Sequence, residues 1–171
     1  MSSYRDLITL TRYKTWADNR LYESLADVSD TALVAERKTR LGSIMITLNH
    51  VYAMDLVWRA HLEGEPHGFT TRRPELFCEL SSLRAAQIQV DDWYENCASE
   101  LDPEASDAIV EFEFIGGGYG SMSRSEILLH VVNHTTYHRG HITDAMLQIP
   151  ARAPTTDFPV YLREISKGVA N

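Results

Sequence analysis

The chain has 171 residues, 44% of them hydrophobic, and a formal net charge of −8 at pH 7. This length and apolar content fit a single domain, residues 1–171, with an ordinary buried core. The acidic balance without any basic block argues against a nucleic-acid partner, because most of the surface would repel phosphates.

The N-terminal stretch and the cysteines indicate the compartment. MSSYRDLITLTRYK lacks the basic and then apolar layout of a signal peptide, and no apolar run approaches the roughly 20 residues that span a bilayer. Cys78 and Cys97 have no paired or C-x-x-C spacing, which argues against a disulfide framework or a thiolate metal site. We therefore expect a cytoplasmic protein with reduced thiols and no membrane contact.

Two amphipathic helices are predicted first. Residues 4–27 repeat apolar side chains near every 3.6 positions, at Leu7, Leu10, Ala17, Leu21 and Leu25. The second helix starts after Gly42, with Ser43 as a possible N-cap, and ends at the Gly64 and Pro66 pair. Its apolar face carries Ile44, Leu48, Val51, Met54, Trp58 and Leu62. Both apolar stripes need other helices to cover them.

A surface connection and a third helix follow. The segment GEPHGFTTRRPELF, 64–77, carries four breakers, so neither a helical nor a strand period runs through it. Apolar residues then repeat in steps of three and four, as in a bundle helix, and Pro103 ends the pattern. They are Leu83, Ala86, Val90, Trp93, Cys97 and Leu101.

The pattern changes to period two between Ile109 and Phe114, which predicts a short strand with Val110, Phe112 and Phe114 on one face. GGGYG, 116–120, lacks the residues of a phosphate loop and is interpreted as a hairpin turn. Ser123 and Glu126 make a capping box for a fourth helix that runs to Ile149, before Pro150. A short terminal helix is expected at 161–169.

Four long amphipathic helices and one small β element predict an all-α four-helix bundle, with a β-hairpin between the third and fourth helices. The two connections before the third helix each have roughly 15 residues, whereas up-and-down neighbours usually need about 2 to 8. At least one long crossover connection is therefore expected.

The fourth helix carries HVVNHTTYHRGH, 130–141, which holds four of the seven histidines. At about 100° per residue, His130, His134, His138 and His141 fall within roughly 80° and share one face. A lone helical histidine is usually a surface residue or a hydrogen-bonded core residue. Several neutral imidazoles on one core-facing stripe instead indicate a divalent metal, which satisfies two or three ring nitrogens at once.

Spacing limits which histidines can act together. Positions four apart lie about 6 Å apart along the axis and can share an ion, whereas positions eight apart, about 12 Å, hardly can. Both H-x-x-x-H pairs and the 138/141 pair satisfy this limit, and the H-E-x-x-H protease signature is absent. A third ligand must come from elsewhere: His50 or His61 can supply it, but hardly both, because about 16 Å of helix separates them. His67, in the 64–77 connection, is expected in solvent.

Residues near these histidines give weaker indications of a role at the metal site. Asn49 and Asn133 each precede a histidine, point away by about 100° and are expected to pack or to meet solvent. Asp55 is a weak candidate for supporting a ligand, because its spacing takes it off the face of the nearest histidine. Tyr137 and Arg139 are expected at the bundle surface, at a subunit contact or at a substrate.

Four stretches cover nearly the whole chain in order: YKTWADNRLYESLADVSDTAL (13–33), LGSIMITLNHVYAMDLVWRAHLEG (41–64), HVVNHTTYHRGH (130–141) and DFPVYLRE (157–164). Together they resemble the DinB family of small metal-binding bundles. One departure is His141, which stands where that family commonly has a glutamine after H-R-G.

The resemblance implies an up-down-down-up bundle with its crossover between the second and third helices. It also implies one divalent metal ion held by His50, His134 and His138. Zinc, nickel and iron all suit three imidazole ligands, which leave coordination positions open, as in catalytic sites.

The family is related to bacterial thiol-dependent enzymes such as bacillithiol transferases and mycothiol-dependent maleylpyruvate isomerases. The resemblance therefore implies a metal-dependent enzyme that transfers a low-molecular-weight thiol to an electrophilic small molecule, with metal-assisted hydrolysis as a second reaction. The alternative is a non-enzymatic metal- or ligand-binding bundle in a stress response. A homodimer is expected, because dimers are common among such bundles.

Overall fold

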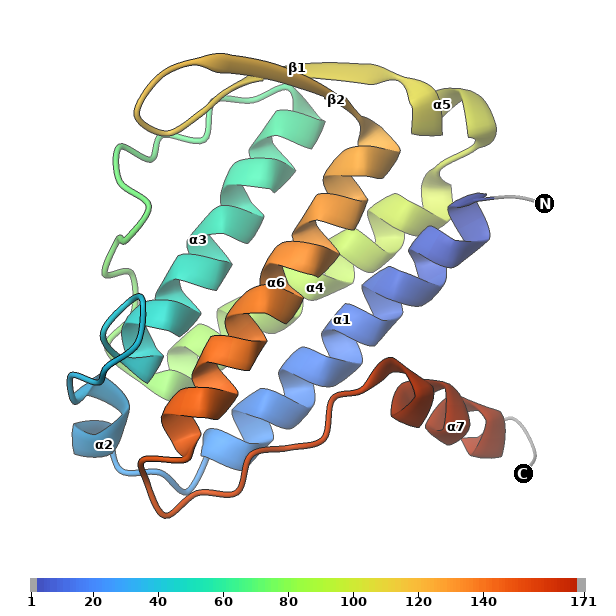
Figure 1. Cartoon of the computed structure of the whole chain (residues 1–171). Coiled ribbons are helices and arrows are strands. Elements are labelled where there is room, and N and C mark those ends of the chain that lie inside the picture. The colour runs from blue at the N-terminus through green and yellow to red at the C-terminus, as the bar shows by residue number, and fades with distance from the viewer. Residues whose placement is uncertain (1–2, 169–171) are drawn as a thin grey trace.

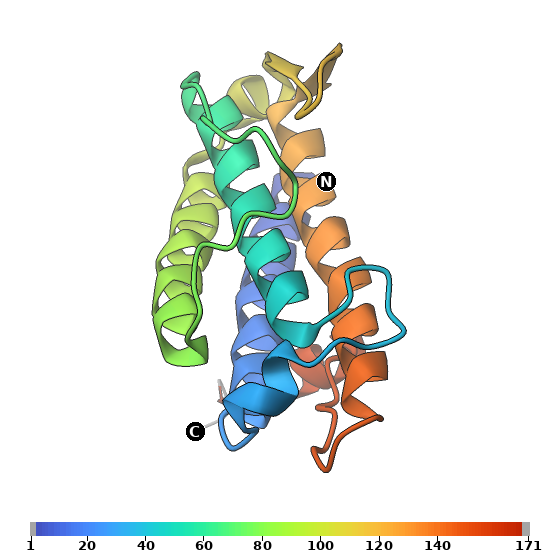
Figure 2. The same cartoon turned by 90° about the vertical axis from the view of Figure 1, so that its left-hand side faces the viewer.

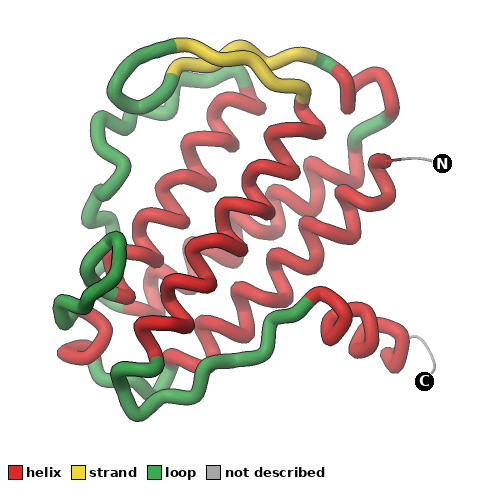
Figure 3. Tube along the Cα trace, viewed as in Figure 1, coloured by secondary structure: helices red, strands yellow, loops and turns green. Residues whose placement is uncertain are grey.

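A computed structural model describes the backbone of residues 3–168 and the side chains of residues 6–167. Four long helices lie side by side in it, and a two-stranded hairpin crosses one end (Figures 1 and 3). The long helices are α1 (Ser3–Leu25), α3 (Ile44–Glu63), α4 (Leu80–Glu100) and α6 (Arg124–Met146). The prediction of a helical fold with one small β element is confirmed. None of the described helices is long and apolar enough to cross a membrane.

The long helices pack in a closed arrangement, in which α1 contacts α4 and α6, and α3 contacts the same two helices. In Figure 1, α3 and α4 begin at the same end and run in the same direction, while α1 and α6 run the opposite way. The connection 64–79 therefore has to return along the length of α3, as Figure 2 shows. A 20-residue helix is about 30 Å long, a distance that about ten extended residues can span.

Caps confirm both predicted ends of the second helix and the predicted start of the fourth. The Ser43 side chain accepts a hydrogen bond from the Ile46 amide, and Gly64 ends α3 in the left-handed conformation, with φ 73°. Ser123 and Glu126 form the expected capping box at the start of α6. α6 ends at Met146, before the predicted Ile149, because the chain turns through residues 147–150.

Two short helices were missing from the prediction. α2 (Asp30–Val34) begins at the N-cap Ser29 within the first connection. α5 (Pro103–Asp107) begins at the N-cap Asp102, so that Pro103 starts a helix as well as following one. Proline suits the first helical turn, where its missing N–H has no partner to lose. A third short helix, α7 (Phe158–Gly168), agrees with the predicted terminal helix, whose last residue, 169, lies outside the described residues.

The buried face of α4 differs from the predicted one. Leu83, Val90 and Leu101 are buried as expected, but Trp93 and Cys97 are only partly buried. Their places in the core are taken by Gln87, Asp91, Tyr94 and Ala98. The apolar pattern misplaced this face because it excluded the two polar residues, whose partners lie on other helices.

Those partners belong to a buried charged cluster, defined by Lys14, Asp18, Asp55, Asp91 and Arg139. The Lys14 ammonium lies 2.9 Å from an Asp55 oxygen and 3.1 Å from an Asp18 oxygen, and it also contacts Asp91. Arg139 lies 2.9 Å from the other Asp18 oxygen. All five side chains are at most 5% exposed. The cluster joins α1, α3, α4 and α6.

The hairpin consists of β1 (Ile109–Glu113) and β2 (Tyr119–Ser123), paired antiparallel with Phe112 opposite Gly120. Gly116, Gly117 and Gly118 have φ between 93° and 97°, which confirms the turn at this glycine run. The Phe112 ring packs edge-on against Trp58 of α3, 4.9 Å between centroids. Phe114 follows the end of β1 and is 43% exposed, so the predicted apolar face ends at Phe112.

Candidate metal centre

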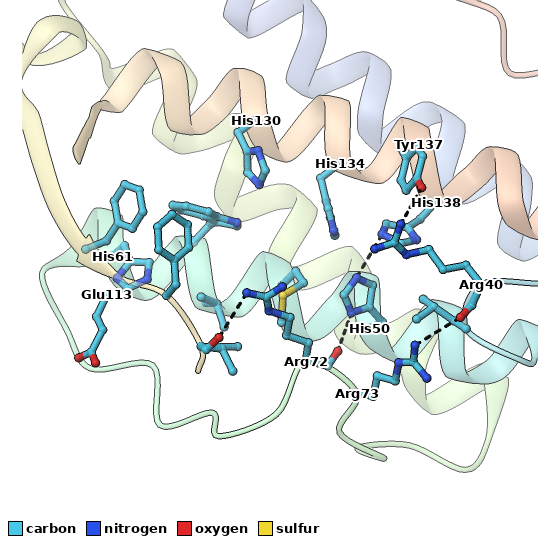
Figure 4. Close-up of a pocket in the computed structure, with 17 residues that line it drawn as sticks. Arg40, His50, His61, Arg72, Arg73, Glu113, His130, His134, Tyr137 and His138 are labelled. Atoms are coloured by element: carbon cyan, nitrogen blue, oxygen red, sulfur yellow. Dashed lines mark hydrogen bonds between the residues drawn. The ribbon is translucent and has the colours of Figure 1, made fainter. Parts of the chain in front are cut away.

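Helices α3 and α6 bring three of the predicted ligands together. His50 lies in the second turn of α3, and His134 and His138 lie one turn apart on the facing side of α6. Figure 4 shows the three rings converging between the two helices. Within the described residues this is the one group of three or more metal-ligating side chains whose ligand atoms lie within 4.8 Å of one another.

The distances within this histidine triad suit one small ion. The ring centroids of His50 and His134 are 5.2 Å apart, and those of both other pairs are 4.5 Å apart. Nε2 of His50 lies 3.1 Å from Nε2 of His138. Two nitrogens bound tetrahedrally to zinc at about 2.0–2.1 Å would be about 3.3 Å apart. An ion therefore fits between these rings with small adjustments.

The backbone of the 64–79 connection orients His50. Its Nδ1 donates a hydrogen bond to the carbonyl oxygen of Arg72, at 2.5 Å. A neutral imidazole protonated on Nδ1 carries its lone pair on Nε2, the atom that faces His138. A hydrogen bond of this kind fixes the tautomer and the ring plane of a metal ligand.

The electrostatics keep the triad neutral. Burial, together with the neighbouring His138 and His50, lowers the pKa of His134 to about 3. Burial followed by His50 lowers the pKa of His138 to about 4. Burial also lowers the pKa of His50, and the charges of nearby arginines act in the same direction. Neutral imidazoles are the form that binds metal ions, and Nδ1 of His134 and of His138 is buried without a partner among the described residues.

The triad opens onto a pocket of about 620 Å³. Its walls come from α3, α6, β1 and the connections around residues 40 and 72. Its other lining side chains include Tyr137, three arginines and the apolar residues Met54, Val57, Trp58 and Phe112. This volume is in the range of pockets that take small organic molecules.

Comparisons with known proteins agree with this architecture. The sequence matches the DinB family over residues 1–167. The chain belongs to the DinB family. It is 26% identical over 158 residues to the protein DinB of Bacillus subtilis strain 168, a match that covers 90% of this chain and 91% of that one. A DinB-like protein from Bacillus cereus ATCC 10987 has the same fold, with a TM-score of 0.62 and 20% identity over 84% of this chain and 91% of that one.

The other histidines of this DinB chain lie outside the triad. His130, one turn before His134, packs on Trp58 with 4.7 Å between centroids and lines the pocket. His61 lies at the far end of the same pocket, where it packs edge-on against His67. His67 is half-buried rather than fully in solvent, because its Nδ1 accepts a hydrogen bond from the Phe69 amide. His141 packs against Tyr137 and is not among the residues that line the pocket.

The structure also places the residues near the histidines for which the sequence indicates a role only weakly. Asn49 is buried and its side-chain oxygen accepts hydrogen bonds from the amides of Leu76 and Phe77, so it anchors the 64–79 connection. Asn133 is exposed. Asp55 and Arg139 both face the buried charged cluster, which rules out the expected surface position of Arg139.

Sequence reasoning missed the arginines at the pocket, Arg40, Arg72 and Arg73. Two of them are adjacent in TTRRP, a basic pair in an acidic chain, which is a weak signal. It also missed Lys14, although this residue lies midway between Leu7 and Leu21 in the apolar stripe of α1. A charged residue at such a heptad position indicates a buried partner of opposite charge.

Proposed function

We propose that this DinB family member is a divalent-metal-dependent enzyme that joins a low-molecular-weight thiol to an electrophilic small molecule. The observation that carries the proposal is the triad: three neutral imidazoles converge at one wall of an open pocket. Three protein ligands leave at least one coordination position for an exogenous group, the arrangement of catalytic rather than structural metal sites.

His50, His134 and His138 would hold the ion, which we expect to be zinc, nickel or iron. When bound, such an ion supplies Lewis acidity, which lowers the pKa of a thiol or a water molecule at its open position. The thiol sulfur then bonds to the electrophilic carbon, the leaving group departs with its bonding electron pair, and the thiol proton passes to solvent. The apolar pocket walls would hold the electrophile and exclude competing water.

The test is turnover by the metal-loaded protein. The purified chain would be analysed for bound metal and incubated with monochlorobimane and one of four thiols: bacillithiol, mycothiol, glutathione or cysteine. We expect fluorescent conjugate to form with at least one thiol, and its formation to stop after chelation or in His50→Ala. An ester substrate without thiol tests the hydrolytic reaction in parallel.

His61→Ala is the matched control, because it removes a histidine of the same helix that lies outside the triad. It should still bind one equivalent of metal. A protein that binds one equivalent of metal but turns over none of these thiols would contradict the transferase proposal and favour a binding function.

Two expectations about the architecture accompany this proposal. We propose that the four long helices form the up-down-down-up bundle implied by the family resemblance, which the helix directions in Figure 1 support. We further propose a cytoplasmic homodimer. Light scattering coupled to size-exclusion chromatography tests the dimer, and a mass of 19.4 kDa, that of one chain, would contradict it.

A further inference from the structure

The charge of the pocket is opposite to that of the chain. The whole sequence has 24 acidic and 16 basic side chains, excluding histidine. The pocket, by contrast, is lined by Arg40, Arg72 and Arg73 and by one carboxylate, that of Glu113. A bound divalent ion would make the positive charge still larger. The mouth of this site therefore attracts anions to a protein that otherwise repels them.

The three guanidinium groups of the pocket are held by neutral acceptors. Arg72 donates to the carbonyl oxygen of Ile115 at 3.3 Å, and Arg73 donates to that of Arg40 at 3.3 Å. Arg40 itself lies 3.5 Å from the Tyr137 hydroxyl. Each guanidinium has five N–H donors, so most donors remain available after these contacts.

No ion pair joins these three arginines to a carboxylate in the part of the chain that the structure describes. Some arginines outside the pocket have such partners, at Arg20–Glu164, Arg59–Glu63, Arg84–Glu23 and Arg139–Asp18, whereas others, such as Arg37 and Arg124, also donate to neutral carbonyl oxygens. Three arginines that line one pocket of an otherwise acidic protein, without carboxylate partners, favour binding of an anion from outside the chain.

Apolar side chains line the same pocket. Met54, Val57, Trp58 and Phe112 present apolar and aromatic surface to it. Trp58 and Phe112 are buried and pack edge-on against each other, so this surface is rigid. A ligand that contacts both the arginines and this apolar surface has one anionic group and an apolar body.

We propose that the pocket binds organic anions, with the anionic group of the ligand at Arg40, Arg72 and Arg73 and its apolar or aromatic body against Trp58 and Phe112. The inference rests on the proposed function in placing this ligand beside the catalytic metal, and it assigns the substrate class of that site. The arginines also act on the triad itself, since their charges add to burial in lowering the pKa of His50.

Binding of matched probes tests the assignment. The probes are 4-phenylbutane-1-sulfonate, its neutral analogue 4-phenylbutan-1-ol, and butane-1-sulfonate, which lacks the ring. A sulfonate is chosen because it is a weak ligand for zinc, so that its affinity reports on the arginines. Calorimetric titrations are made with zinc-loaded protein and with metal-free protein at low salt.

We expect the phenyl sulfonate to bind about tenfold more tightly than the alcohol, a difference of about 1.4 kcal/mol, and more tightly than butane sulfonate. The preference over the alcohol should persist without metal and shrink to within about twofold in the triple variant R40Q/R72Q/R73Q. Arg84→Gln removes one arginine outside the pocket and should keep the full preference. Raising the salt concentration should lower the affinity for the sulfonate and leave the affinity for the alcohol unchanged.

Equal affinities for the sulfonate and the alcohol would overturn the proposal, as would no detectable sulfonate binding or a preference that survives the triple variant. If the triple variant does not fold, the same test uses the salt dependence of sulfonate binding and the sulfonate preference of the single variant Arg73→Gln, both of which should fall. Failure of the metal-dependent enzyme would show instead as absent turnover, with the anion preference of the metal-free protein intact. The two failures are therefore distinguishable.

Discussion

Replacing a residue of the histidine triad tests metal binding directly. His134→Ala leaves two imidazoles, and loss of a direct ligand should cost more than the 10–100-fold that loss of a supporting hydrogen bond costs. We therefore expect at least a ~100-fold lower affinity for zinc. The metal content after dialysis, measured by mass spectrometry, should fall from one equivalent to nearly zero.

His130→Ala is the control for this variant. It removes an imidazole from the same face of α6, one turn away, which packs on Trp58 and stacks on His134 but is not one of the three candidate ligands. It should keep one equivalent of metal. Full occupancy in the His134→Ala protein would show that the triad is not the metal site.

The 64–79 connection depends on one side chain of α3. The Asn49 side chain accepts hydrogen bonds from the amides of Leu76 and Phe77 and donates one to the Phe77 carbonyl oxygen. Asn49→Ala removes these three hydrogen bonds and leaves partly buried backbone groups unpaired, which should destabilise the folded state by about 1–3 kcal/mol. Urea unfolding should show a free energy of unfolding lower by that amount.

Asn133→Ala is the matched variant on α6, because Asn133 also precedes a triad histidine but is exposed. Its free energy of unfolding should change by less than about 0.5 kcal/mol. Equal effects of the two substitutions would contradict the anchoring role of Asn49.

The elements also show how far sequence patterns reach. Caps such as Ser43 and the Ser123/Glu126 box could be predicted because their partners lie within one helical turn. The face of α4 could not, because Gln87 and Asp91 are buried by partners on other helices. Periodicity identifies an apolar stripe but gives no sign that a polar residue has a partner in the core.

At the scale of the whole molecule, the buried charged cluster connects all four long helices. Lys14→Met would leave the carboxylates of Asp18, Asp55 and Asp91 without their shared cation. Removal of one member of a buried ion pair typically costs about 3–5 kcal/mol. We expect a loss of at least this size in the free energy of unfolding, measured with urea.

Arg12→Met is the control on the same helix. Arg12 is 60% exposed and lies 3.9 Å from Glu95, so its loss should cost less than about 1 kcal/mol. A Lys14→Met protein as stable as the control would mean that the cluster contributes no net stability.

The cluster also predicts a pH dependence. It holds two cations and three carboxylates. Burial raises the pKa of Asp91 to about 7, against the lowering effect of Lys14. The unfolded chain releases this proton near pH 4, so between pH 4 and 7 the folded state binds more protons, and this contribution to stability is lost as the pH rises through about 7.

Asp91→Asn removes this titration. Relative to the natural sequence, the variant should gain stability as the pH increases from 5 to 8, as measured by urea unfolding of both proteins at each pH. Effects of unrelated groups cancel in the difference. A difference that stays constant over this range would rule out the raised pKa of Asp91.

The sequence by itself determined the four long helices, the hairpin turn and the histidine stripe, because each depends on spacing within one segment. It left open which pair of the stripe acts together, and the family resemblance selected His134, His138 and His50. Only the tertiary structure brought these three rings to one pocket wall, with Arg40, Arg72 and Arg73 beside them and Lys14 among three carboxylates. The physical reason is that these arrangements depend on how helices and connections distant in sequence pack together, which local periodicity does not encode.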